Sequence, residues 1–218
     1  MKISVIFALT ISFLIGCATT LEERYDEYEN SIQIGNKIIR INKDFRYAGN
    51  LSSTHDKEYL DGPSYSTKMV FGEHFFMHNN ADGKIDKTII IYTYTLTKVG
   101  DYWREEVNFK KSKQYLSHMH LGSTKINNKK CACVVKKWPY IGERYVKFAR
   151  GKGYEFDKSK HCIIEAKIGK TISRSTIMHV SYLEGSDSCE SIRNEEGQNS
   201  EIIQTMLSKF QSHVNIKW

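Results

Sequence analysis

Proline is scarce in this sequence, and the scarcity limits how the chain can be divided. Only Pro63 and Pro139 occur among 218 residues, so no proline-rich linker separates two domains. No second long apolar run follows the first fifteen residues, whereas about 18 or more such residues are needed for a membrane-spanning helix. We therefore predict that the chain after its N-terminal segment is one domain that does not cross a membrane.

The sequence also lacks the short motifs that most often identify an enzyme. It has no Gly-x-Ser-x-Gly nucleophile elbow. Gly151-Lys152-Gly153 lacks the longer spacing of a phosphate-binding loop and is better explained as a turn. His161-Cys162 is not part of a Cys-x-x-Cys-His haem-attachment motif. These absences favour a protein without catalytic activity or cofactor, but they leave open a hydrolase or metal-binding protein whose site no motif reveals.

The most specific signal is present in the first twenty residues, MKISVIFALTISFLIGCATT. Lys2 precedes an apolar run from Ile3 to Ile15, which is short for a membrane-spanning helix and typical of the apolar region of a signal peptide. The run ends in Leu14-Ile15-Gly16-Cys17, an aliphatic residue, a variable position, a small residue and a cysteine. An ordinary secretory signal, cut after a small residue, and an uncleaved membrane anchor are the alternatives.

The tetrapeptide Leu14-Ile15-Gly16-Cys17 resembles the lipobox of bacterial lipoproteins. The resemblance implies lipid attachment to Cys17, cleavage before it and anchoring in the cell envelope. Members of this family carry more than one acyl chain on the cysteine, which makes anchoring stable at ~0.8 kcal/mol per buried methylene. Ala18 rather than aspartate follows the cysteine. By resemblance, this favours the outer membrane, facing the periplasm, if the source has two membranes.

Charge is distributed unevenly along the chain. Leu21–Asn30 holds five acids against Arg24 alone, whereas the whole chain has a formal net charge of +7. We predict a signal peptide over 1–16, a lipid-anchored acidic tether over 17–30 and a single domain over 31–218. The basic domain could be attracted to anionic lipid headgroups or to an envelope protein, although scattered lysines equally fit an ordinary solvated surface. Nucleic acid is not expected as a partner of an exported protein.

Strand patterns fill most of the predicted domain. Apolar alternation on both sides of Gly35-Asn36 predicts a hairpin. Residues 67–109 predict a three-stranded antiparallel meander, with turns at Asn79–Gly83 and Val99–Asp101. Residues 50–64 are predicted as a polar loop, and 111–121 fit either helix or strand. Further strands are predicted at 131–135, 145–148, 162–168 and 171–183, the last two joined at Gly169-Lys170.

An apolar stripe predicts a helix near the end of the sequence. Asn199 or Ser200 can cap it, and Glu201 in its first turn suits the helix dipole. The stripe has i, i+4 spacing and consists of Ile202, Met206 and Phe210, flanked by Ile203 and Leu207. We predict an α+β fold, mainly antiparallel sheet, with this amphipathic helix packed on one face.

Four cysteines follow Cys17, namely Cys131, Cys133, Cys162 and Cys189. An even number of cysteines in an exported domain favours two disulfides. Cys131 and Cys133 are separated by one residue, so within a strand they cannot bridge each other in good geometry. We predict that each is joined to Cys162 or Cys189, and the choice between the two arrangements stays open.

A metal site is the competing interpretation of some of these residues. His118 and His120, like Cys131 and Cys133, lie two residues apart, so each pair would share one face of a strand. Thiolate and imidazole ligands suit Cu(I) or Zn. We predict disulfides rather than metal. The sequence as a whole predicts a membrane-anchored envelope lipoprotein that serves as a non-catalytic binding or assembly module, with an envelope hydrolase or a metal-binding protein as the alternative.

Overall fold

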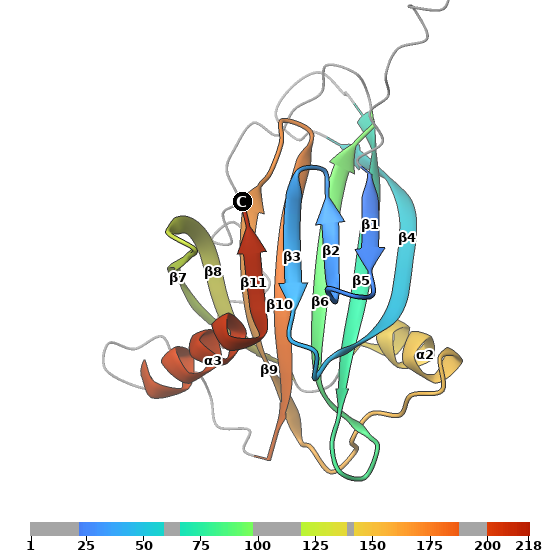
Figure 1. Cartoon of the computed structure of the whole chain (residues 1–218), viewed down its shortest axis with the longest axis vertical. Coiled ribbons are helices and arrows are strands. Elements are labelled where there is room, and N and C mark those ends of the chain that lie inside the picture. The colour runs from blue at the N-terminus through green and yellow to red at the C-terminus, as the bar shows by residue number, and fades with distance from the viewer. Residues whose placement is uncertain (1–21, 59–65, 98–118, 139–141, 188–199) are drawn as a thin grey trace, which may run out of the picture.

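The computed structural model describes residues 22–58, 66–97, 119–138, 142–187 and 200–218. Within them the chain forms two antiparallel sheets and two helices, α2 (Glu143–Gly151) and α3 (Ser200–His213) (Figure 1). Neither of these helices is long and apolar enough to span a bilayer. The strands are β1 (Glu23–Asp26), β2 (Ser31–Ile34), β3 (Lys37–Ile41), β4 (Arg46–Glu58), β5 (Ser66–Asn79), β6 (Ile85–Leu96), β7 (Met119–Ile126), β8 (Lys129–Trp138), β9 (Cys162–Thr171), β10 (Thr176–Ser186) and β11 (Val214–Lys217).

The larger sheet has seven strands in the order β4-β5-β6-β10-β9-β8-β7, and the smaller sheet has four in the order β1-β2-β3-β11. The two strands in the middle of the larger sheet, β6 and β10, are far apart in the sequence and pair with Thr95 opposite Thr176. In the smaller sheet β11 pairs with β3, which places Lys217 opposite Ile38. The predicted class, α+β with mainly antiparallel sheet, is therefore confirmed.

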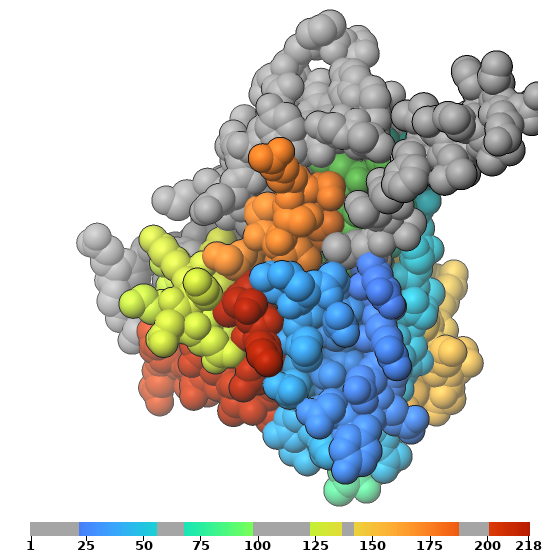
Figure 2. Space-filling model, turned by 45° about the horizontal axis from the view of Figure 1, so that its top comes forward, coloured from blue at the N-terminus to red at the C-terminus, as the bar shows by residue number. Residues whose placement is uncertain are grey.

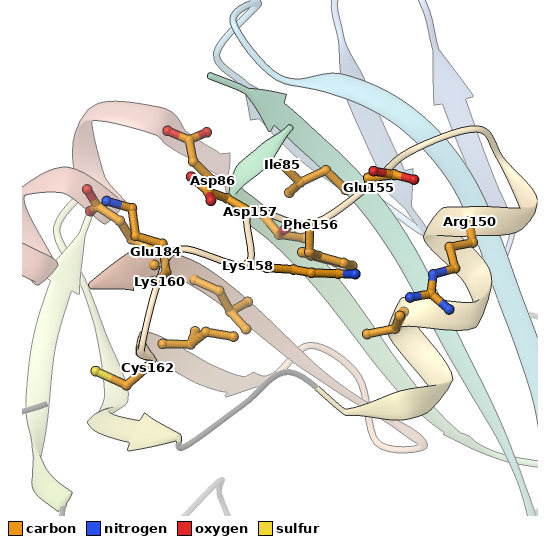
Figure 3. Close-up of a pocket in the computed structure, with 15 residues that line it drawn as sticks. Ile85, Asp86, Arg150, Glu155, Phe156, Asp157, Lys158, Lys160, Cys162 and Glu184 are labelled. Carbon is orange, nitrogen blue, oxygen red and sulfur yellow. The ribbon is translucent and has the colours of Figure 1, made fainter. Parts of the chain in front are cut away.

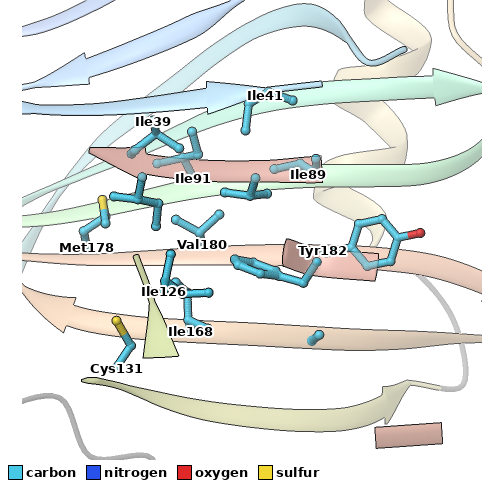
Figure 4. Packing of buried hydrophobic residues seen from close by; sticks show 14 of the residues in the cluster. Ile39, Ile41, Ile89, Ile91, Ile126, Cys131, Ile168, Met178, Val180 and Tyr182 are labelled. Atoms are coloured by element: carbon cyan, nitrogen blue, oxygen red, sulfur yellow. The ribbon is translucent and has the colours of Figure 1, made fainter. Parts of the chain in front are cut away.

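The two sheets face each other across the main apolar cluster (Figure 4). We call the face of the larger sheet that contacts this cluster the inner face. Ile39 of β3 belongs to the cluster together with Ile91 of β6 and Val180 of β10, and all three are fully buried. Met206 and Phe210 of α3 are buried in the same cluster.

A second apolar cluster covers the opposite, outer face of the larger sheet. Phe75 of β5 and Ile90 of β6 belong to it, as does Ala149 of α2. The ring of Phe148 in α2 lies 4.4 Å from that of Phe75, measured between centroids. Strand residues that alternate in the sequence therefore enter two different clusters, and the larger sheet is buried on both faces.

Two predicted turns are confirmed. Ile34 of β2 lies opposite Lys37 of β3, so the chain reverses over Gly35-Asn36. Gly35 has φ +58° and Gly83, between β5 and β6, has φ +76°. Glycine adopts this left-handed region without the steric cost of a Cβ atom.

The predicted three-stranded meander is only partly correct. Strands β5 and β6 pair as predicted, with Phe75 opposite Ile90. The second edge of β6 pairs with β10, so the third predicted strand, whose residues 102–109 lie outside the described residues, cannot occupy that edge. Alternation indicates that a segment is a strand, but it does not identify the neighbour with which the strand pairs.

Two predicted loops are wrong because their residues form strand pairs. Residues 50–58 continue β4, an edge strand that tolerates polar side chains because only one of its edges pairs, with β5. Gly169 and Lys170 do not join two strands, since both lie within β9 opposite His179 and Met178. The connection to β10 consists of residues 172–175.

Helix α2 replaces the strand predicted at 145–148. Tyr145, Phe148 and Ala149 have i, i+3, i+4 spacing, which brings them to one helical face against the outer cluster. Of the ambiguous segment 111–121, the residues from Met119 onward belong to strand β7. Strand β11 was not predicted, because four residues directly after a helix give little periodic signal.

The acidic segment predicted as a tether joins the fold from Glu23 onward, because its side chain binds the inner face of the larger sheet. The Glu23 carboxylate accepts hydrogen bonds from Thr93 Oγ1 at 2.6 Å and from His74 Nε2 at 2.9 Å. Gly72 leaves space for it, since a Cβ atom there would lie 2.5 Å from Thr93 Oγ1 and 3.2 Å from Glu23 Oε2. The body of the protein therefore begins at β1, and only the residues before Glu22 remain available as a tether.

Loss of this anchored carboxylate should be visible in the pH dependence of stability. Burial alone would raise the pKa of Glu23, but hydrogen bonds from His74 and Thr93 together outweigh burial and lower the pKa below 4.5. A lowered pKa stabilises the fold at pH values above the ordinary pKa, and this contribution is lost as pH falls through the folded-state pKa.

We predict that the unfolding free energy of wild type exceeds that of Glu23→Gln at neutral pH, and that the difference narrows as the pH falls below 4.5. Urea unfolding across this range, with Glu27→Gln in the adjacent turn as control, tests the prediction; parallel curves for wild type and Glu23→Gln would contradict it.

Candidate functional site

A cavity of about 340 Å³ lies at one end of the outer face, between α2, the loop over 152–161 and the ends of β6, β9 and β10 (Figure 3). We call it the outer-face cavity. Its volume is at the lower end of the range of about 300–1,000 Å³ that is typical of small-molecule sites. Its apolar lining consists of Ile85, Val146, Phe156, Ile163 and Leu183.

Backbone hydrogen bonds hold the loop that forms one wall of the cavity. Ile85 N donates to Glu155 O at 2.7 Å, and Asp157 N donates to Ile85 O at 2.9 Å. The loop thus runs beside the start of β6, with a bridge between Ile85 and Phe156. Asn80 Nδ2 in the β5–β6 turn donates to Asp157 Oδ2 at 3.1 Å and fixes the loop a second time.

Lys160 lines the cavity, and its side chain approaches Gly185 of β10. A Cβ atom on Gly185 would lie 2.6 Å from Lys160 Cγ, so this close approach needs glycine at position 185. The Lys160 ammonium donates to both carboxylate oxygens of Asp187, at 3.0 and 3.1 Å. The charge of Lys160 is therefore already paired within the protein.

Three of the four acids that line the cavity have partners in the fold. Asp86 Oδ1 lies 2.6 Å from His78 Nδ1. Glu184 accepts hydrogen bonds from Lys209 Nζ at 2.8 Å and from Tyr182 OH at 2.9 Å. Asp157 is held in its own loop, as described above, and the fourth acid, Glu155, is exposed.

Arg150 and Lys158, two cations that line the cavity, differ from these acids in having no charged partner among the described residues. Among the described residues, neither Arg150 at the end of α2 nor Lys158 in the loop forms an ion pair. Figure 3 shows their charged groups pointing toward one another. Two like charges repel, so this arrangement favours an anion between them. The cavity thus combines an apolar lining with two cations that form no ion pair in the part of the chain that the structure describes, and the exposed Glu155 lines the same cavity.

A group of charges, all buried or partly buried except the exposed Arg144, lies next to the cavity on the outer face. We call Glu73, Lys136, Arg144, Glu165 and Lys167 the ionic cluster. Glu165 is only 3% exposed and accepts a hydrogen bond from Ser181 Oγ at 2.6 Å. Its second oxygen lies 3.1 Å from Lys136 Nζ, and Lys167 Nζ is 3.9 Å from the first. Because Glu165 lies opposite the cavity residue Leu183, the ionic cluster supports the strands beneath the cavity.

Glu73 attaches α2 to the sheet and so positions one wall of the cavity. It is 0% exposed, and its carboxylate lies 2.6 Å from Arg144 Nη2 and accepts a hydrogen bond from Tyr145 OH at 3.1 Å. Burial raises the pKa of Glu73, and Arg144 opposes that rise. The ion pair therefore compensates the cost of a carboxylate that has no contact with solvent.

Burial lowers the pKa of two basic groups on this part of the outer face, Lys167 of the ionic cluster and His179. Lys167 Nζ lies 4.3 Å from the centre of the Tyr92 ring, and burial lowers its pKa. Burial lowers the pKa of His179 to about 3, so the imidazole is neutral at ordinary pH. Neutral His179 adds no charge to the ionic cluster, in which the two acids Glu73 and Glu165 face three bases.

The cysteine pairing predicted from the sequence does not fit the strand register. Cys133 of β8 lies opposite Ile168 of β9, six residues from Cys162. Six residues of strand span about 20 Å, whereas disulfide Cα atoms lie about 4.4–6.8 Å apart. Cys131 lies still farther along β8, and both predicted arrangements require a bridge from one of these residues to Cys162. Cys189 and the lipidation candidate Cys17 lie outside the described residues.

The alternative metal site also finds no support in the described residues. Cys131 and Cys133 are buried in the main apolar cluster, and burial raises the pKa of both thiols, which opposes the thiolate form that binds metal. His120 lies opposite Val135, and His118 is outside the described residues. No three His, Cys, Asp or Glu residues of the described segments gather as metal ligands.

Of the residues that line the cavity, only Cys162 is a candidate site residue from the sequence, as a partner in a disulfide. Gly151-Lys152-Gly153, next to the cavity residue Arg150, is predicted as a turn, and nothing in it indicates that the following loop returns to β6. Comparison of the chain with protein-family models, with curated proteins and with solved structures found no match. The assignment of the site therefore depends on its own geometry.

Removal of the buried carboxylate should detach α2. We predict that Glu73→Ala lowers the unfolding free energy by about 2–3 kcal/mol, because Tyr145 loses its acceptor and Arg144 its counter-ion. Hydrogen exchange in 143–151 should accelerate at the same time. The matched control is Glu143→Ala, since Glu143 is 82% exposed and pairs with Lys147 within the helix; this variant should leave stability unchanged. Equal effects of the two substitutions in urea unfolding would contradict the assigned role of Glu73.

Proposed function

We propose that the protein is an envelope lipoprotein whose domain binds a small amphipathic anion in the outer-face cavity, without catalysing a reaction. One observation carries the ligand class: Arg150 and Lys158 point toward one another at an apolar cavity, and neither forms an ion pair among the described residues. The lipid anchor is supported by Leu14-Ile15-Gly16-Cys17 in the sequence.

The chemistry of the lining narrows the ligand further. Phe156, Ile163 and Leu183 favour an aliphatic or aromatic body, because burial of apolar surface contributes about 25 cal/mol per Å². The planar Arg150 guanidinium suits a carboxylate or phosphate, to which it can donate two parallel hydrogen bonds. A volume of about 340 Å³ limits the ligand to a small molecule or a single short acyl chain.

The proposal includes the packing of α3 as an amphipathic helix over the inner face. Its support is the burial of Ile203, Met206 and Phe210 among residues of the larger sheet. Because α3 covers the inner face in this proposal, the ligand binds on the outer face. The anchor and the cavity are thus assigned to separate parts of the molecule.

Decanoate is a suitable probe of the cavity because it joins an aliphatic chain to one carboxylate. We predict that wild type binds decanoate and that the double variant Arg150→Gln, Lys158→Gln binds it at least tenfold more weakly, about 1.4 kcal/mol. Val146→Trp, which fills the cavity, should abolish binding. Isothermal titration calorimetry measures all three affinities.

Two controls distinguish binding in this cavity from attraction of decanoate to other surface charges and from adsorption of its alkyl chain. Lys84→Gln, Lys147→Gln removes the same charge outside the cavity and should leave the affinity for decanoate unchanged. Decanol has the chain without the carboxylate and should bind wild type more weakly than decanoate does. Equal binding of decanoate to wild type and to Val146→Trp would refute the assigned cavity.

The anchor is tested separately. We predict that Cys17→Ser releases the protein from membranes or leaves the precursor unprocessed, because no thiol remains for acylation. Detergent phase partitioning of wild type and variant measures the change, and Ser12→Ala within the apolar run is the matched control that should behave as wild type. Partitioning of wild type into the aqueous phase would show that the protein is not lipidated.

A further inference from the structure

The start of β1 lies at the same end of the molecule as the ends of several other elements, and we call it the anchor-proximal end. Gly35 N in the β2–β3 turn donates to Glu22 O at 3.1 Å. Asn127 Nδ2 in the β7–β8 turn donates to Ile216 O of β11 at 2.6 Å, and Trp218 Nε1 donates to Ile126 O at 2.9 Å. Figure 2 shows β11 and the β7–β8 hairpin beside the first strands on one surface.

Basic side chains gather at this end. Lys170 Nζ of β9 donates to Lys130 O of β8, which brings two of them together. The described acids here are the exposed Glu22, the half-buried Glu23, which is bound to His74 and Thr93, and Asp56 and Glu58 at the end of β4, where Asp56 lies opposite Lys68. The basic residues, all exposed except the half-buried Lys37 and Lys170, are Lys37, Lys68, Lys125, Lys129, Lys130, Lys170, Arg174 and Lys217.

The opposite end of the strands has a different charge pattern and holds the outer-face cavity. Cavity residues Ile85, Ile163 and Gly185 lie at the start of β6, the start of β9 and the end of β10. The eleven residues of β10 separate the two ends by about 35 Å. Cations at that end are interspersed with acids, namely Asp26, Glu27, Glu29, Asp44, Asp82, Asp86, Glu155, Asp157, Glu184 and Asp187.

The length of the remaining tether limits how far the basic end can be from a membrane. Glu22 already contacts the fold, so five residue steps separate it from Cys17. Five extended residues reach at most about 18 Å. This reach is about two Debye lengths at physiological ionic strength. A lipid on Cys17 would therefore hold the anchor-proximal end near the bilayer, and a tether that is not fully extended brings its basic residues within one Debye length of the headgroups, beyond which charges are largely screened.

We propose that the anchor-proximal end is a membrane-contact surface that binds anionic headgroups and turns the outer-face cavity away from the bilayer. This inference depends on the lipid anchor proposed above and adds the surface and the orientation. Trp218 supports it, because its half-buried indole lies beside this surface with Lys170 Nζ 5.5 Å from the ring centre. Tryptophan is favoured at membrane–water interfaces, where its ring meets the headgroups.

Lysine footprinting of the mature, lipidated protein on vesicles tests the orientation. A membrane-impermeant amine reagent is applied to protein on phosphatidylcholine vesicles, and to protein on vesicles in which about one third of the lipid is phosphatidylglycerol. We expect labelling of Lys125, Lys129 and Lys170 to fall about fivefold on the anionic vesicles, while Lys84 and Lys147 are unaffected. About 1 M salt should remove the difference, because it shortens the Debye length to about 3 Å.

Charge-reversal variants distinguish contact through this surface from attraction of the whole basic domain to anionic vesicles. In Lys129→Glu, Lys130→Glu, Lys217→Glu the protection of Lys125 and Lys170 should be lost, while the protein still floats with the vesicles. The matched control Lys43→Glu, Lys84→Glu, Lys147→Glu carries the same charge change elsewhere and should retain the protection.

Each other outcome has a distinct meaning. Wild-type protein that floats with vesicles but is labelled equally on both lipid compositions overturns the orientation and leaves the anchor intact. Protein that floats with neither vesicle overturns the anchor, and the orientation with it. Protection by dissolved polyphosphate but not by anionic vesicles assigns the surface to soluble polyanions and overturns the membrane contact.

Discussion

Burial of both faces of the seven-stranded sheet is the constraint on which the rest of the structure depends. Its central strands β6 and β10 alternate large side chains between two clusters, so that Ile91 and Val180 enter one cluster while Ile90 and Leu183 enter the other. Neither face can remain in water without exposing a large apolar patch. The smaller sheet covers the inner face across a cluster that also contains Met206 and Phe210 of α3, and α2 covers part of the outer face. The cavity forms where α2 ends and a loop continues the cover.

The sequence was most informative where structure is local. Alternation predicted β5 and β6, and Gly35 predicted the first hairpin, because a turn or a period of two depends on residues that are close in the chain. The pairing of β6 with β10 joins segments about 90 residues apart, and no pattern within either segment encodes it. Polar residues 50–58 were misread because an edge strand needs no continuous apolar face. Strand β11 was not predicted because its four residues form a strand by pairing with the distant β3, which no local pattern indicates.

The candidate site was largely hidden for a similar reason. Its walls come from three strands, a helix and a loop, and Arg150 approaches Lys158 only because the loop returns to Ile85 through backbone hydrogen bonds. The cysteines suggested a different centre, but the register of β8 and β9 sets Cys133 and Cys162 apart. The ionic cluster was also invisible in sequence, since Glu73 and Glu165 appear as isolated acids. The lipid anchor remains a prediction from residues that the structure does not describe.

The pairing of β3 with β11 has a consequence for the order of folding. Residues of β3 are synthesised early and those of β11 about 170 residues later, so the smaller sheet lacks one strand during most of synthesis. Until that strand arrives, apolar side chains of the inner face have an incomplete cover and can associate with other chains. Long-range pairing of this kind also slows folding, because the entropy of closing the loop is lost before the contact forms. Nascent chains of this protein therefore need protection from aggregation until Val214 and Ile216 are in place.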